Sequence, residues 1–149
     1  MMPDSNTLPA GEAAADYHGL TLLMIEDSST LRVLLRQSLS RLLPGVTIVE
    51  AADGRQAIHE LTRCRADLVL TDLQMPGVDG RSFLAKLRGN PLLRRKKVVV
   101  LSSDDVRDLR DLYVADDGIR FLAKPSEPAE LVRTILELLP ADASFRAPR

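Results

Sequence analysis

Charged and hydroxyl side chains follow four of the five apolar runs in this sequence, at the points where those runs end. Glu26 and Asp27 follow the first run, Asp72 the third, Ser102 the fourth and Lys124 the fifth. If the runs are parallel strands of one sheet, their carboxyl ends share an edge, which is where ligands bind in open α/β sheets. The pattern therefore predicts three carboxylates, one hydroxyl and one lysine at a single site.

The predicted group of side chains suits a metal ion and a phosphoryl group. Three carboxylates held together repel one another unless a cation lies between them. Oxygen ligands without neighbouring histidine or cysteine favour Mg²⁺, with Mn²⁺ as the alternative. A lysine beside them can contact a phosphoryl oxygen, and a hydroxyl can donate to another. We expect carboxylate attack on phosphorus, with Asp72 as the nucleophile because it ends the middle run.

Five apolar runs alternate with five segments of helical periodicity. The expected strands, by residue number, are 20–25, 46–51, 68–71, 98–101 and 119–123. Alternation of this kind predicts right-handed crossovers and a parallel sheet whose two faces are both covered by helices. The predicted fold is therefore α/β, a doubly wound three-layer α/β/α sandwich around a five-stranded parallel sheet.

Capping residues indicate where the helices begin. Ser28 or Ser29 can cap the first helix, Asp53 the second and Ser126 the last, which has Pro128 in its first turn. Apolar spacings of three and four predict amphipathic helices. These positions are Leu31, Leu34, Leu35, Leu39 and Leu42 in the first helix, and Val106, Leu109 and Leu112 in the fourth.

Composition indicates the domain organisation and the compartment. We expect a flexible N-terminal leader (residues 1–18), one domain (19–139) and a short C-terminal tail (140–149). The single cysteine, Cys64, cannot form an internal disulfide, and no apolar run approaches the roughly 20 residues that span a membrane. The sequence therefore predicts a cytoplasmic protein without a membrane segment.

Charge argues against direct nucleic-acid binding. The formal net charge is −1, which does not suit a bulk polyanion partner. The basic run at residues 94–97 is the best candidate for such a contact, but no aromatic residue is interleaved with it. We interpret this run as a solvated basic loop.

The strand-end residues and their neighbours resemble the receiver domain of two-component response regulators. The matching motifs are Glu26-Asp27, Glu50-Ala-Ala-Asp-Gly54, Asp72-Leu-Gln-Met-Pro-Gly-Val-Asp-Gly80, Ser102 and Lys124-Pro125, and they span about 120 residues in order. The resemblance implies a flavodoxin-like receiver fold. It also implies a phosphorylation-driven switch of the stand-alone, chemotaxis-regulator-like kind.

The resemblance implies roles for the acidic residues. Asp72 resembles the aspartate that is phosphorylated. Glu26 and Asp27 resemble the acidic pair that holds Mg²⁺, with Asp72 itself and the backbone carbonyl of Gln74 completing the protein ligands. The metal is therefore expected to be bound by oxygen atoms alone.

The resemblance also implies a set of switch residues. Lys124 and the hydroxyl of Ser102 resemble the groups that contact the phosphoryl oxygens, and Phe121 resembles an aromatic residue that swings inward with that hydroxyl. Pro125 resembles a proline preceded by a cis peptide bond, which is a specific expectation because cis bonds are a small minority even before proline.

Three positions depart from the commoner pattern of this family. Glu26 stands where aspartate is commoner, which can alter the affinity for the metal. Ser103 stands where a small apolar residue is usual, and with Gln74 it is expected to tune the rate at which water removes the phosphoryl group. Asp117-Gly118 replaces the usual Gly-Ala pair, which affects the loop before the fifth strand.

The expected partners are proteins. A sensor histidine kinase or a histidine phosphotransfer protein would donate the phosphoryl group, docking on the first helix (31–43) and the loop after the fifth strand. Output contacts are expected on the surface of the fourth helix, fifth strand and fifth helix, and a phosphorylation-dependent homodimer is a further option. The candidate contact residues there are Arg107, Asp108, Arg110, Asp111, Tyr113 and Arg120.

Two other functions stay open at this point. The chain could be the receiver part of a larger DNA-binding transcription regulator. It could also be a Mg²⁺-dependent phosphohydrolase with an aspartate nucleophile, although such enzymes often place a second acid two residues later, where this chain has Gln74. The main expectation is a non-enzymatic signalling switch, limited to self-phosphorylation from a phosphodonor and autodephosphorylation.

Overall fold

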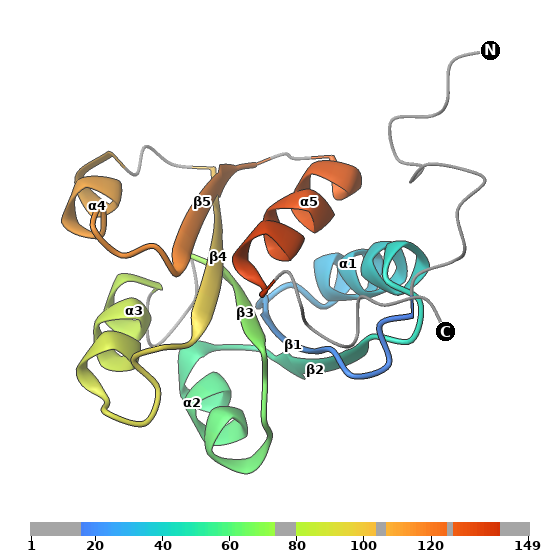
Figure 1. Cartoon of the computed structure of the whole chain (residues 1–149), viewed down its shortest axis with the longest axis horizontal. Coiled ribbons are helices and arrows are strands. Elements are labelled where there is room, and N and C mark those ends of the chain that lie inside the picture. Colours follow the sequence, from blue (N-terminus) through green and yellow to red (C-terminus); the bar gives the residue numbers. More distant parts are fainter. Residues whose placement is uncertain (1–15, 74–79, 104–106, 125–126, 141–149) are drawn as a thin grey trace.

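The computed structural model describes residues 16–73, 80–103, 107–124 and 127–140. All five strands are parallel and form one sheet in the order β2-β1-β3-β4-β5. Figure 1 shows α1 and α5 on one face of the sheet and α2, α3 and α4 on the other, which confirms the predicted sandwich. The elements are β1 (Thr21–Ile25), α1 (Ser29–Leu42), β2 (Thr47–Ala51), α2 (Gly54–Arg63), β3 (Leu68–Asp72), α3 (Gly80–Gly89), β4 (Lys97–Ser102), α4 (Arg107–Leu112), β5 (Ile119–Ala123) and α5 (Pro128–Leu138).

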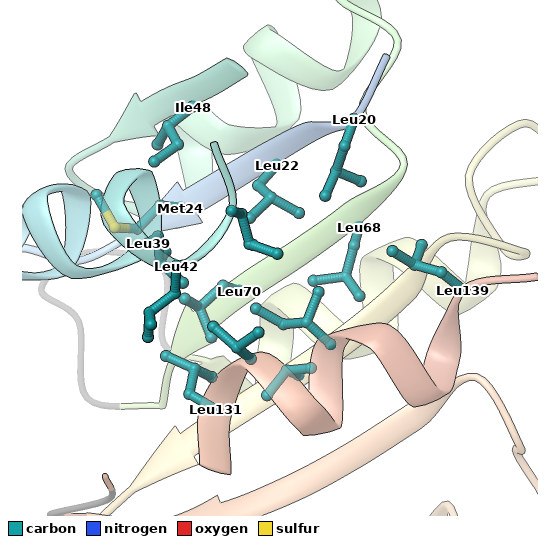
Figure 2. Packing of buried hydrophobic residues seen from close by; sticks show 14 of the residues in the cluster. Leu20, Leu22, Met24, Leu39, Leu42, Ile48, Leu68, Leu70, Leu131 and Leu139 are labelled. Atoms are coloured by element: carbon teal, nitrogen blue, oxygen red, sulfur yellow. The ribbon is translucent and has the colours of Figure 1, made fainter. Parts of the chain in front are cut away.

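Alternate residues of the strands divide between two apolar cores, because side chains along a strand point to opposite faces. Leu22 and Leu70 pack under α1 and α5, in the cluster that Figure 2 shows. Leu23 and Val69 pack on the other face with Phe83 of α3. Every residue of β3 is buried, so the strand that ends at Asp72 is fixed from both sides.

The predicted helix starts are confirmed at two helices and wrong at a third. The Ser28 hydroxyl accepts from the Leu31 N–H at 3.3 Å, and an Asp53 oxygen accepts from the Gln56 N–H at 2.8 Å. At α5 the capping position is Glu127, whose side chain makes no capping bond, so the expected Ser126 cap is wrong. Ser126 itself lies outside the described residues. Pro128 occupies the first turn of α5 as expected, and its fixed φ suits that position.

The apolar positions of two helices are only partly used by the core. In α1, Leu39 and Leu42 are buried, whereas Leu31 and Leu34 are 43% and 53% exposed. In the six-residue α4 Leu109 alone is buried, and Leu112 is 73% exposed. The third predicted position, Val106, lies outside the described residues. Helical spacing defines a face, but it does not define how far the neighbouring elements extend beneath that face.

The packed part of the chain begins before the predicted leader ends. Tyr17 is 5% exposed and belongs to the core under α1 and α5. Its N–H donates to the carbonyl of Pro44 at 2.9 Å, which anchors it to the α1–β2 connection. The apolar ring of Tyr17 is therefore part of the folded domain, two residues ahead of Gly19.

The loop before β5 is organised by Asp116. Its carboxylate accepts hydrogen bonds from the guanidinium of Arg88 and, at 3.0 Å, from the N–H of Gly118. Burial alone would raise the pKa of Asp116, but these hydrogen bonds and the charge of Arg88 lower it. Arg88 also donates to the carbonyl of Lys96 at 2.9 Å, so one side chain ties α3 to the starts of β4 and β5.

Candidate functional site

The carboxyl ends of β1, β3, β4 and β5 deliver the predicted side chains to one edge of the sheet. Asp72 is paired with Leu101 across β3 and β4, which brings it beside the end of β4. Ser102 is paired with Ala123, and the N–H of Lys124 donates to the carbonyl of Ser102 at 2.9 Å. The pairing register of the strands therefore places these residues at a common edge of the sheet, as predicted from the sequence.

Three carboxylates and one ammonium group meet at this edge. Glu26, Asp27 and Asp72 each offer an oxygen atom, and these atoms lie within 4.8 Å of one another. Glu26 and Asp72 are buried and Asp27 is exposed, so the cluster opens to solvent on one side. The Lys124 Nζ lies 3.0 Å from an Asp72 oxygen and 3.5 Å from a Glu26 oxygen.

This cluster has the chemistry of a site for a hard divalent cation. Burial raises the pKa of the Glu26 carboxyl, while the N–H of Ser28 and the charge of Lys124 oppose that shift. A single lysine does not neutralise three carboxylates, and all the donor atoms are oxygens. The arrangement fits Mg²⁺ or Mn²⁺, which are bound through a few carboxylates and several waters.

Arg32, which belongs to none of the sequence motifs, contacts the backbone of the acidic pair. Its Nη1 donates to the carbonyls of Glu26 and Asp27, at 2.7 and 3.4 Å. Its Nε lies 3.5 Å from an oxygen of Glu50, whose other oxygen accepts from Arg36 at 2.8 Å. Arg32 lies one turn into α1, within reach of the β1–α1 loop. In the sequence, this contact could have been inferred only from an arginine six residues after Glu26.

A close backbone contact fixes the start of the connection after Asp72. The N–H of Gly80 donates to the carbonyl of Leu73 at 2.9 Å. A Cβ at Gly80 would lie 2.5 Å from the Cα of Leu73, which is well inside van der Waals contact. Only glycine therefore allows α3 to begin against the residue that follows Asp72.

The remaining predicted residues are placed as follows. Ser102 is buried at the end of β4, and Ser103 is exposed just beyond it. Phe121 is half-buried on β5, and the guanidinium of Arg110 lies 5.6 Å above its ring centre. The predictions on Gln74 and on the cis bond before Pro125 concern positions outside the described residues.

A model of a known protein family matches most of the folded part of this chain. The family model described as the response regulator receiver domain matches residues 22–136. The chain belongs to the response regulator receiver family. It therefore contains a receiver domain of two-component signalling systems, which confirms the function class expected from the sequence.

Curated relatives of this receiver domain include response regulators and differ in overall length. The nitrate/nitrite response regulator protein NarL of Escherichia coli K12 is 35% identical over 116 residues, covering 77% of this chain and 52% of NarL. The cyclic di-GMP phosphodiesterase response regulator RpfG of Xanthomonas campestris is 29% identical, covering 83% of this chain and 35% of RpfG. The chain thus spans about half or less of these two relatives. Protein PilG of Pseudomonas aeruginosa is 27% identical, covering 83% of this chain and 90% of PilG.

Solved structures support the same fold. The response regulator TrrA of Thermotoga maritima, crystallised in complex with Mg²⁺ and BeF, is 25% identical with a TM-score of 0.69, covering 80% of this chain and 99% of TrrA. Chemotaxis protein CheY4 of Vibrio cholerae is 24% identical with a TM-score of 0.71, covering 80% of this chain and 98% of CheY4. Among the described residues of the receiver domain, no helix has the length and apolar character needed to cross a membrane.

Proposed function

We propose that this receiver domain accepts a phosphoryl group on Asp72 and uses it to change its contacts with other proteins. The observation that carries the proposal is the meeting of Asp72, Glu26 and Asp27 within 4.8 Å, with Lys124 3.0 Å from Asp72. A carboxylate held by a lysine beside two further acids is suited to attack on phosphorus. The proposal includes a non-enzymatic role and a cytoplasmic location.

The proposed transfer joins Asp72 to a phosphohistidine of a partner kinase or phosphotransfer protein. An oxygen of Asp72 attacks phosphorus, an O–P bond forms, and the N–P bond to the partner imidazole breaks with the electron pair leaving on nitrogen. Glu26, Asp27, Asp72 and the backbone carbonyl of Gln74 would hold Mg²⁺ or Mn²⁺, which when bound offsets the charge of the transferred group. Lys124 contacts the phosphoryl oxygens, and the Ser102 hydroxyl donates to one of them.

The switch that we propose is a shift between two populations of the domain. Ser102 is buried beside the site, and Phe121 lies on the next strand, three residues before Lys124. Movement of the hydroxyl toward the phosphoryl group would leave space into which Phe121 turns. Because the phosphoryl group binds one conformation better than the other, it shifts the population between them. Water would reset the switch by hydrolysis, at a rate tuned by Gln74 and Ser103.

Two exposed surfaces are suited to the proposed partners. Leu31 and Leu34 lie one turn apart on α1, close to the acidic edge, and their exposure favours α1 as the docking helix for the phosphodonor. Leu112 and Val114 are 73% and 81% exposed at the end of α4, beside the charged row of that helix. This second surface, completed by β5 and α5, is the proposed output face and the proposed homodimer contact.

The proposed chemistry is tested by intact mass. The protein is incubated with Mg²⁺ and a small phosphodonor, with Asp72→Asn as the control. The wild type is expected to gain the mass of one phosphoryl group and the variant none. Equal incorporation in both proteins, or none in the wild type at saturating donor, would show that Asp72 is not the acceptor.

A further inference from the structure

The opposite end of the sheet carries a second surface with a distinct chemistry. A cavity of about 400 Å³ lies where β3 and β4 begin, between the α2–β3 loop, the α3–β4 loop and the end of α5. Asp67, which lines the cavity, is five residues before Asp72, and at about 3.3 Å per strand residue the two lie about 17 Å apart along the chain. A ligand here would therefore not compete with phosphorylation.

The lining of this cavity is strongly cationic. In the described part of the chain, four cationic side chains line it with a single carboxylate, that of Asp67. One oxygen of Asp67 already accepts from the N–H of Thr21 at 2.8 Å, which reduces its capacity to pair with a cation. Within the described ranges, the guanidinium groups of Arg65 and Arg95 form no ion pair, and both side chains are exposed. Two of the charges are thus available to an acidic ligand.

The cavity also has an apolar wall. Leu92, Leu139 and Pro140 line it beside the cations. Leu92 is 89% exposed, whereas its neighbour Leu93 is 5% exposed and lies in the core. A single exposed leucine is ordinary on a protein surface. An exposed leucine at the mouth of a cationic cavity is a combination suited to a ligand with both acidic and apolar groups.

The loop that holds Leu92 is ordered by hydrogen bonds. The N–H of Leu92 donates to an Asn90 side-chain oxygen at 2.9 Å, and the N–H of Leu93 donates to the Asn90 carbonyl at 3.0 Å. The Nζ of Lys96 donates to the carbonyl of Ala66 at 2.7 Å, joining the α3–β4 loop to the α2–β3 loop. A surface that is already ordered loses little conformational freedom when it binds.

We propose that this cavity is a docking site for an acidic protein segment that carries an apolar side chain. Glutamate or aspartate side chains would pair with Arg65 and Arg95, and the apolar side chain would lie against Leu92. Charge complementarity selects the acidic partner. A protein segment fits better than a nucleic acid because, among the described residues, no aromatic side chain lines the cavity to stack a base. The site is independent of the proposed phosphorylation.

The proposal is tested with a defined peptide. The probe is a fluorescein-labelled octapeptide of six glutamates and two leucines, measured by fluorescence anisotropy at low and high salt. The Arg65→Gln/Arg95→Gln variant is expected to bind about tenfold more weakly than wild type. Leu92→Ser is expected to lose about tenfold as well, because it removes the apolar contact. High salt should weaken wild-type binding.

Matched controls separate docking from bulk charge. Arg55→Gln/Arg133→Gln removes the same charge from exposed positions on α2 and α5, and its affinity should stay within twofold of wild type. Asp72→Asn should also bind the peptide like wild type, so failure of the proposed phosphorylation does not affect this test. Thermal melts of the arginine and Leu92 variants should coincide with that of the wild type, since those substituted side chains are exposed.

Three results would overturn the proposal. The first is equal peptide affinity in the Arg65→Gln/Arg95→Gln variant and its control. The second is tighter binding of a DNA oligonucleotide than of the peptide, with the same dependence on Arg65 and Arg95, which would assign the surface to nucleic acid. The third is wild-type self-association in sedimentation that Leu92→Ser abolishes, which would assign it to a second copy of the chain.

Discussion

Lys124 lies between two buried carboxylates, those of Asp72 and Glu26, at 3.0 and 3.5 Å from its Nζ. Its positive charge partly offsets the free-energy cost of burying these two carboxylates. The offset is incomplete at Glu26, whose pKa is still raised by burial. The side chain that would contact a phosphoryl group is therefore held at the acceptor before any transfer. A site ordered in this way needs little rearrangement to bind the incoming charge.

The stacking of Arg110 on Phe121 leads to a prediction about the proposed switch. The contact exists while Phe121 is half-exposed, and it would be lost if the ring turned inward. A cation–π contact at an exposed site contributes about 0.5–1 kcal/mol. Arg110→Met should therefore raise the affinity for Mg²⁺ and beryllofluoride, an aspartyl phosphate mimic, about two- to fivefold. Titration calorimetry measures this affinity.

The control for this prediction is Arg133→Met on the exposed side of α5, which should leave the beryllofluoride affinity unchanged. In a Phe121→Ala background the effect of Arg110→Met should disappear, since the ring is gone. An unchanged affinity in Arg110→Met alone would mean that the stacking does not oppose the switched state.

At the scale of elements, the β1–α1 loop and the first turns of α1 act together through Arg32. Its guanidinium donates to the carbonyls of the acidic pair and is oriented by Glu50 on β2. A group that orients metal ligands typically changes metal affinity 10- to 100-fold when it is removed. Arg32→Gln is therefore expected to weaken Mg²⁺ binding by about tenfold or more. Titration calorimetry with Mg²⁺ alone measures this.

Arg36 supplies a matched control for Arg32. It pairs with the same Glu50, but its other bond goes to the carbonyl of Ile48 and not to the acidic loop. Arg36→Gln should lower the free energy of unfolding while leaving the Mg²⁺ affinity within about twofold of wild type. Equal losses of Mg²⁺ affinity in both variants would indicate a general loosening of α1.

At the scale of the whole molecule, stability should depend on pH through Asp116. Its folded pKa lies below the ordinary value of 3.8, so the unfolded chain binds the proton more tightly. The contribution of Asp116 to stability is therefore fully present above about 3.8 and is lost as the pH falls through the folded pKa. The unfolding free energies of wild type and Asp116→Asn, measured with urea, should differ at pH 7, and the difference should shrink as the pH falls below 3.8. A difference that stays constant with pH would contradict this origin.

The sequence was sufficient for the fold because the apolar runs and the helical spacings are strong signals. It was also sufficient to predict that Glu26, Asp27, Asp72 and Lys124 lie at one edge, since the carboxyl ends of parallel strands share an edge of the sheet. Their roles in phosphoryl transfer stay predictions.

Other features depended on contacts that spacing does not encode. The exposure of Leu31 depends on how far the neighbouring elements extend under α1, and the position of Arg110 over Phe121 depends on the packing of α4 against β5. The start of α5 at Pro128, with Glu127 as an uncapped boundary residue, was missed because serine is the stronger capping residue by type.

The contact between Gly80 and Leu73 has a consequence for inherited variation. Any single-nucleotide change that replaces a glycine with another residue adds at least one carbon, and here that carbon would meet a backbone atom at 2.5 Å. In a library of all codon changes, position 80 should therefore be depleted of every missense allele. Gly89, with nothing within 4 Å of a Cβ, should retain most of them. Gly80 and Gly89, which the sequence alone does not distinguish, would therefore differ sharply in the substitutions that they tolerate.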